Sequence, residues 1–72
     1  MTPDGWTRDH RDSPWHYFYY RGQNAGHILH VPGHIHPYLA AMWWLGGRDE
    51  YWADNLDEAK RWVEVTVRLN AW

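Results

Sequence analysis

Histidine is the residue type in this chain that most directly suggests chemistry. Four histidines lie close together in the sequence: His27, His30, His34 and His36. Because side chains alternate along a strand, His34 and His36 would project to the same side, a spacing that suits Zn²⁺. His27 is expected on that side too, which gives three candidate metal ligands. The alternative is a set of surface histidines without a metal, since acidic residues that could complete the site are distant in sequence.

Aromatic residues are the second candidate for function. Seven Trp, five Tyr and one Phe make up 18% of the 72 residues. Each of these rings can bury about 150–250 Å². A chain of this length buries only about 60% of its unfolded surface, so its core cannot enclose them all. We therefore expect some rings at the surface, where they would form a partner site or a dimer interface.

The composition argues against several other classes of function. The chain has no Cys, one Ser and no glycine-rich phosphate loop, so we do not expect an enzyme, a disulfide or a thiolate metal site. The formal charge is −2 and most Arg residues have an acidic neighbour, which disfavours broad binding to nucleic acid. No apolar run approaches the roughly eighteen residues of a membrane span, and the N-terminus lacks a signal-peptide pattern. A cytoplasmic location without a membrane partner is expected.

The elements that must position these side chains are clearest near the C-terminus. Asn55 can cap a helix that begins at Leu56, and Glu58 can complete a capping box. Helical spacing then gives one apolar stripe, formed by Leu56, Ala59, Val63 and Val67. A strand over residues 63–70 is the rival interpretation, because valines alternate with polar residues there. We favour the helix, since no Gly or Pro interrupts the run.

The segments before this helix predict strands. Residues 15–20 form the first and residues 27–31 the second, which ends at a turn at Pro32-Gly33. Residues 37–45 suit either a third strand or a short helix with Pro37 at its start. We favour the strand, because Gly46-Gly47 then becomes a hairpin turn into a fourth strand over residues 49–53.

The expected fold is therefore α+β. Residues 15–72 would form one small domain, a three- to four-stranded antiparallel meander with one C-terminal helix packed on one face, and residues 1–14 a flexible N-terminal arm.

Pairing about the two turns sorts the side chains into two faces. The face expected under the helix carries Ile28, His30, Ile35, Leu39, Ala41, Trp43, Leu45 and Trp52. The opposite face, which nothing in the chain would cover, carries His27, Leu29, Val31, His34, His36, Tyr38, Met42, Trp44 and Tyr51. Trp62 begins a second apolar strip on the helix. The candidate partner-binding residues are Tyr38, Trp44, Tyr51, His27, His36 and Trp62.

The order of these segments resembles a group of known proteins. An aromatic strand, Gly-His-Ile-Leu-His and Tyr-Leu-Ala-Ala-Met-Trp-Trp-Leu-Gly-Gly precede a helix that opens with Leu56, Glu58, Ala59 and Lys60. Over residues 15–64 this resembles small proteins of actinobacterial phages and their hosts, in which a short meander runs into a helix with a Leu-x-Glu-Ala-Lys type start. The pattern also resembles the arm-type DNA-binding domains of tyrosine recombinases, which place three strands before a helix opened by a Glu-Ala pair. Those domains carry basic residues on the sheet, where this chain has His and Tyr.

Together these observations predict a non-catalytic protein-interaction module. The phage resemblance implies a partner among the host's proteins and a location in the host cytoplasm, and a homodimer is a further possibility. The alternatives are a nucleic-acid-binding domain of the recombinase-arm type and a protein that binds Zn²⁺ through His27, His34 and His36. No other cofactor is expected.

Overall fold

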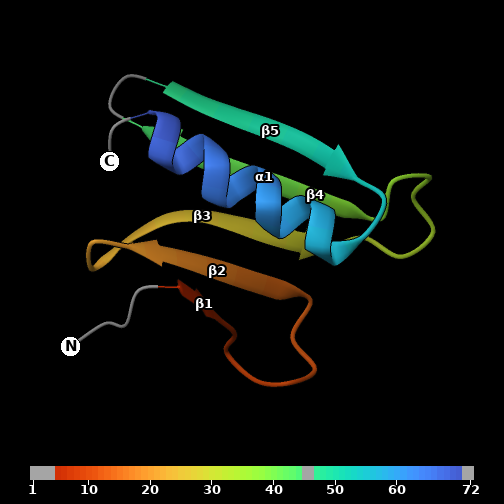
Figure 1. Ribbon diagram of the computed structural model, residues 1–72. Coiled ribbons are helices and arrows are strands. Elements are labelled where there is room, and N and C mark those ends of the chain that lie inside the picture. The colour runs from red at the N-terminus through yellow and green to blue at the C-terminus, as the bar shows by residue number, and fades with distance from the viewer. Residues whose placement is uncertain (1–4, 45–46, 71–72) are drawn as a thin grey trace.

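The chain folds into one antiparallel sheet with one helix on one side (Figure 1). The computed structural model describes residues 5–44 and 47–70, without the side chain of Trp44. Five strands follow one another across the sheet in chain order. Their bounds, and those of the helix, are β1 Gly5–Thr7, β2 Trp15–Tyr20, β3 Gln23–His30, β4 Tyr38–Trp44, β5 Gly47–Ala53 and α1 Leu56–Leu69.

Helix α1 begins as its sequence signals predict. Asn55 is the N-cap, in an extended conformation, and its Oδ1 accepts a hydrogen bond from the backbone N–H of Glu58 at 2.8 Å. The carboxylate of Glu58 reaches back to the N–H of Asp54 at 3.4 Å, one residue before the expected partner. Ala59, Val63 and Val67 are fully buried, so the predicted apolar stripe and the helix itself are confirmed and the rival strand is not formed.

The predicted strands are present, and the sheet has one strand more than expected. β2 has the predicted bounds, β3 starts earlier than predicted, and residues 38–44 are extended instead of helical. The expected hairpin turn at Gly46-Gly47 lies partly outside the described residues. The additional strand is β1, which pairs Trp6 with Phe18 of β2. This edge strand lies within residues 1–14, the stretch expected as an N-terminal arm.

Trp6 fastens this added strand to the rest of the fold. Its ring lies 5.0 Å from the ring of Phe18, and its Nε1 donates to Oε1 of Glu64 on α1 at 3.0 Å. The ammonium group of Lys60 lies 5.7 Å from the centre of the Trp6 ring. Because its contacts are on β2 and α1, a three-residue strand becomes part of the two-layer packing.

The core lies between α1 and the middle of the sheet. The helix packs mainly on β4, with β3 and β5 on either side. At the centre of the contact are Ile28, Ala40 and Met42 from the sheet and Val63 from the helix, all with no exposed surface. The complete buried cluster is Phe18, Ala25, Ile28, Ala40, Met42, Ala53, Ala59, Val63 and Val67.

The pairing of β3 with β4 differs from the prediction and reverses the faces of β4 and β5. A tight turn at Pro32-Gly33 would pair His30 with Ile35, whereas His30 pairs with Tyr38 and residues 31–37 form a loop. The shift is by three residues, and an odd shift moves every following side chain to the other face of a sheet. Tyr38, Met42 and Tyr51 therefore lie on the helix side, and Leu39, Ala41, Trp43 and Trp52 lie on the side away from the helix. Ile35, expected in the core, is 84% exposed in the loop.

Candidate protein-interaction face

The candidate site is the side of the sheet away from α1, which we call the open face. No helix or strand among residues 5–44 and 47–70 covers it, because the single helix lies on the other side (Figure 1). Alternation along each strand places its side chains, since the neighbours of the core residues point away from the core. The open face is formed by Trp15, Tyr17, Tyr19, His27, Leu29, Leu39, Ala41, Trp43, Arg48, Glu50 and Trp52.

Three rings form a row across the middle of this face, which we call the aromatic row: Trp15, His27 and Trp43. They come from β2, β3 and β4, the three inner strands. The centre of the His27 ring lies 5.2 Å from that of Trp15 and 5.3 Å from that of Trp43, with the planes at 87° and 64°. Nε1 of Trp43 donates to the backbone oxygen of Asn24 at 3.0 Å. Edge-to-face contacts and this hydrogen bond hold the row in one arrangement before any partner binds.

The electrostatics of the open face favour a neutral surface. Burial lowers the pKa of His27 below its ordinary value, the positive charge of Arg48 lowers it further, and Glu50 opposes the shift. His27 is therefore an uncharged imidazole at neutral pH. Arg48 pairs with Glu50 at 3.1 Å. The charges on the face thus cancel, and an apolar partner can cover its centre without burying a lone ion.

At the rim of the face, a side chain of β2 contacts the β1–β2 connection. The hydroxyl of Tyr17 donates to Oδ2 of Asp9 at 3.4 Å. Burial is the largest cause of a raised pKa of Tyr17, and the negative charge of Asp9 and this hydrogen bond add to it. Tyr17 also stacks on Trp15, with ring centres 6.5 Å apart. The rim therefore carries a neutral phenol next to a carboxylate, a polar border to the apolar centre.

Of the six predicted partner-binding residues, the structure places His27 on the open face. Tyr38 lies on the helix side, stacked on His30 at 4.7 Å, because of the shifted register. His36 lies in the loop after β3. Trp44 is in β4, and its side chain is outside the described part of the structure. The remaining two, Tyr51 and Trp62, lie together on the helix side.

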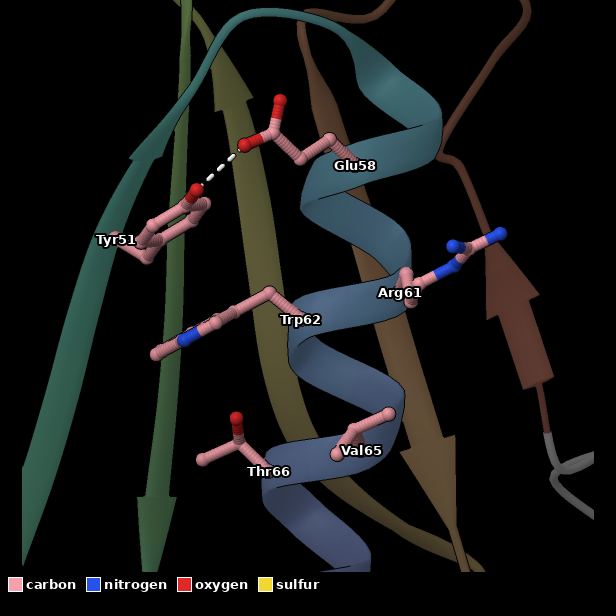
Figure 2. A pocket seen from close by; sticks show the side chains of 6 residues that line it. All are labelled: Tyr51, Glu58, Arg61, Trp62, Val65 and Thr66. Atoms are coloured by element: carbon pink, nitrogen blue, oxygen red, sulfur yellow. Dashed lines mark hydrogen bonds between the residues drawn. The ribbon is translucent and has the colours of Figure 1, made fainter.

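Tyr51 and Trp62 form a separate feature between β5 and α1 (Figure 2). Their rings stack 5.5 Å apart, and the Tyr51 hydroxyl donates to Oε1 of Glu58 at 2.5 Å, which is the main cause of a raised pKa of Tyr51. A shallow groove of about 270 Å³ borders this pair, lined also by Arg61, Val65 and Thr66. Trp62 thus packs against the edge of the sheet and does not extend the open face.

Sequence reasoning missed most of the open face, although one signal for it was available. Alternation within residues 15–20 separates Trp15 and Tyr17 from His16 and Phe18 without knowledge of the fold. That signal places the aromatic residues of β2 on two sides. Trp43 and Trp52 could not be found in this way, because their face depends on the pairing of β3 with β4.

The three predicted zinc ligands are not brought together. His27 lies in the sheet, whereas His34 and His36 lie in the loop after β3, with ring centres 6.5 Å apart. Each loop histidine has other contacts: His34 stacks on Trp52 at 3.9 Å, and Nδ1 of His36 lies 2.5 Å from Oδ1 of Asp54. No group of three or more His, Asp or Glu in the described ranges could hold a metal ion. The loop replaces the strand on which the predicted site depended.

Comparison with known proteins gives no relative from which a role could be transferred. No family model, no curated protein and no solved structure matches the chain. Within the described part of the chain, no helix is long and apolar enough to cross a membrane. The function must therefore be argued from the open face itself.

Proposed function

We propose that this protein is a non-catalytic interaction module that binds a partner protein on its open face. The observation that carries this proposal is the aromatic row, Trp15, His27 and Trp43, on a sheet surface that no described element covers. Each of these rings is partly exposed, and monomeric proteins rarely leave contiguous apolar patches exposed to water unless the patch binds something.

The arrangement of the face matches the anatomy of protein interfaces. Aromatic anchors that are fixed before binding lose little conformational entropy, and such residues concentrate binding energy near the centre of an interface. Polar groups belong at the rim, where Tyr17 with Asp9 and Arg48 with Glu50 are found. The resemblance to actinobacteriophage proteins supports the cytoplasm of a bacterial host as the place where the partner is met.

Stacking of nucleic-acid bases is the competing use of exposed rings, and the charges of the face argue against it. A groove that binds single strands combines rings with free cations that follow the phosphates. On the described open face the cation is Arg48, which is paired with Glu50, and the carboxylate of Asp9 lies at the rim. A phosphate backbone would meet more negative charge than positive, so a protein partner fits better.

A photo-crosslinking amino acid tests which surface is used. Benzoylphenylalanine replaces Tyr17 on the open face or, as the matched control, Val65 on the exposed side of α1, which is 48% exposed. Irradiation in cells that make the protein should give protein adducts from position 17 and few from position 65. Adducts removed by nuclease would instead indicate nucleic acid. Equal labelling from both positions, or none from position 17, would contradict the proposal.

A further inference from the structure

We infer that the partner on the open face is a second copy of this chain, paired face to face in a two-fold-symmetric dimer. This inference rests on the proposed function, because it names the partner for the same surface. Each copy would keep its helix on the outside, so that the dimer has four layers in the order helix, sheet, sheet, helix. Sheets packed in this way lie about 10 Å apart, a gap that the rings of both copies would fill.

The molecule is large enough to offer a stable interface. The chain extends over 33 × 25 × 18 Å. A rectangle with the two longer extents covers about 800 Å², the area that each partner buries in a standard stable complex, and the open face lies within that limit. A second copy offers the same outline and can cover the open face over β2, β3 and β4, whereas at β5 the ring of His34 already stacks on Trp52.

The charges also suit self-association. In a two-fold-symmetric dimer the same surface of each copy meets, so a net charge on that surface would repel the same net charge on the other copy. The centre of the open face avoids this because Arg48 and Glu50 neutralise each other within one chain and His27 is uncharged at neutral pH, while the remaining carboxylate, Asp9, lies at the rim. The exposed side of α1, by contrast, carries charged side chains, including Asp57, Arg61 and Arg68. We therefore expect this charged side of α1 to face water in the dimer.

The position of the aromatic row fits a two-fold axis. Its central ring, His27, is on β3, the middle strand of the five. An axis that runs through the interface beside β3 sets the aromatic row of one copy against that of the other. Trp15 and Trp43 then lie on either side of the axis, so that the rings of the aromatic row meet at the centre, where interfaces derive most of their energy.

The oligomeric state of the full chain tests this inference. Sedimentation equilibrium from micromolar to millimolar concentration should give twice the chain mass. Leu39→Arg and Trp52→Arg, both on the open face, should weaken the dimer by roughly 30-fold or more, because each removes an apolar contact and buries a charge. Val65→Arg, on the outside of α1, should leave the dimer unchanged. Circular dichroism and urea unfolding establish that each variant is folded.

A mixing experiment probes the symmetry. Leu29 is on β3, near the proposed axis, so Leu29→Lys and Leu29→Glu should each be monomeric alone and should associate when mixed. A wild type that is monomeric at every concentration would overturn the inference. If Tyr17 of that monomer still crosslinks to another protein, the interaction module stands with a different partner, and if it crosslinks to none, both proposals fail. A dimer disrupted by Val65→Arg and kept by Leu39→Arg would also overturn the inference.

Discussion

At the scale of single residues, Gly26 lies where β3 approaches both β4 and α1 closely. A Cβ at this position would lie 2.8 Å from the backbone oxygen of Ala41 and 2.9 Å from Cγ1 of Val63. Gly26→Ala should therefore push β3 away from both β4 and the helix and lower the free energy of unfolding by about 1–3 kcal/mol. Urea unfolding followed by tryptophan fluorescence measures this. A truncation partner, Val63→Ala, removes one of the two clashes, so the double variant should lose less than the sum of the single changes. Strict additivity would contradict the proposed clash.

His16 couples the stability of the fold to pH. Its side chain is on the helix side of β2, and the residue is 7% exposed. Burial is the main cause of its lowered pKa, and the positive charges of Arg8 and Lys60 and the neighbouring His30 lower it further. A lowered pKa means that the unfolded chain binds a proton more readily than the folded chain. Stability should therefore fall as pH drops below the unfolded value of about 6.5.

Unfolding by urea at several pH values between about 7.5 and 5 tests whether the free energy of unfolding falls with pH as expected. Wild type should lose stability towards the acid end, and His16→Gln, which cannot titrate, should show a smaller loss over the same range. His10 provides the matched control, because it is exposed in the β1–β2 connection. His10→Gln should follow the wild type. A steeper loss in His16→Gln than in the wild type would contradict the assignment of the effect to His16.

At the scale of elements, β1 depends on one side chain. Trp6 packs on Phe18, donates a hydrogen bond to Glu64 and lies under Lys60. Trp6→Ala should cost about 2 kcal/mol, below the value for a fully buried ring because Trp6 keeps some exposed surface. Hydrogen exchange at residues 5–7 should become fast, since the strand would lose its attachment to α1. Trp6→Phe keeps the packing without the hydrogen bond, so its free energy of unfolding should lie between those of the wild type and Trp6→Ala. If protection at residues 5–7 is unchanged in Trp6→Ala, β1 is held by its backbone hydrogen bonds alone.

The same element shows why the sequence predicts some parts of this fold and misses others. The cap at Asn55 and the apolar stripe of α1 are local signals, and they predict the helix and its first residue, Leu56, correctly. β1 has three residues, too few for a pattern, and its attachment joins Trp6 to Glu64, 58 positions apart. An interaction of that kind becomes visible only once the sheet and the helix are already placed.

The faces of β4 and β5 could not be predicted for a related reason. Pro32-Gly33 is a turn signal, and Gly33 does adopt a positive φ of 90°. The loop nevertheless continues to residue 37, because contacts with distant residues support it: His34 stacks on Trp52, and His36 contacts Asp54. These contacts set the length of the connection, and that length decides which side every later strand residue faces. The wrong register also placed Tyr38 and Tyr51, both candidate partner-binding residues, on the wrong face. His27 precedes the loop, and it lies on its predicted face.

At the scale of the whole molecule, five strands share one helix, and this imbalance defines the surface available for binding. A helix about 10 Å wide covers the middle strands on one side, and no other helix or strand of the described residues lies over the opposite side of the sheet. Small domains of two layers commonly leave one sheet face to water when that face is polar. Here the face carries the aromatic row instead, so the imbalance of layers and the chemistry of the surface support the same conclusion, that another protein molecule supplies the missing layer.

The proposed dimer should weaken in acid, because His27 lies at its centre. The rings of Trp15 and Trp43 face His27. Tyr17 on β2 and Ala41 on β4 are opposite it in the sheet. Burial lowers its pKa, Arg48 on β5 lowers it further, and Glu50 raises it. Its pKa is already lowered in one chain, and a second copy would remove more water and bring a second imidazole close. The dimer thus favours the neutral form more strongly than the monomer does, and proton uptake must favour dissociation.

The dissociation constant from sedimentation should therefore rise at least about tenfold between roughly pH 7.5 and pH 5. His27→Phe keeps an aromatic ring in the row and cannot take up a proton, so its dimer should persist across that range. His10→Gln should retain the acid response of the wild type, because His10 is exposed outside the open face. Loss of the dimer in acid that is as large in His27→Phe as in the wild type would assign the response to other groups, and His27 would then have no part in pH-dependent association.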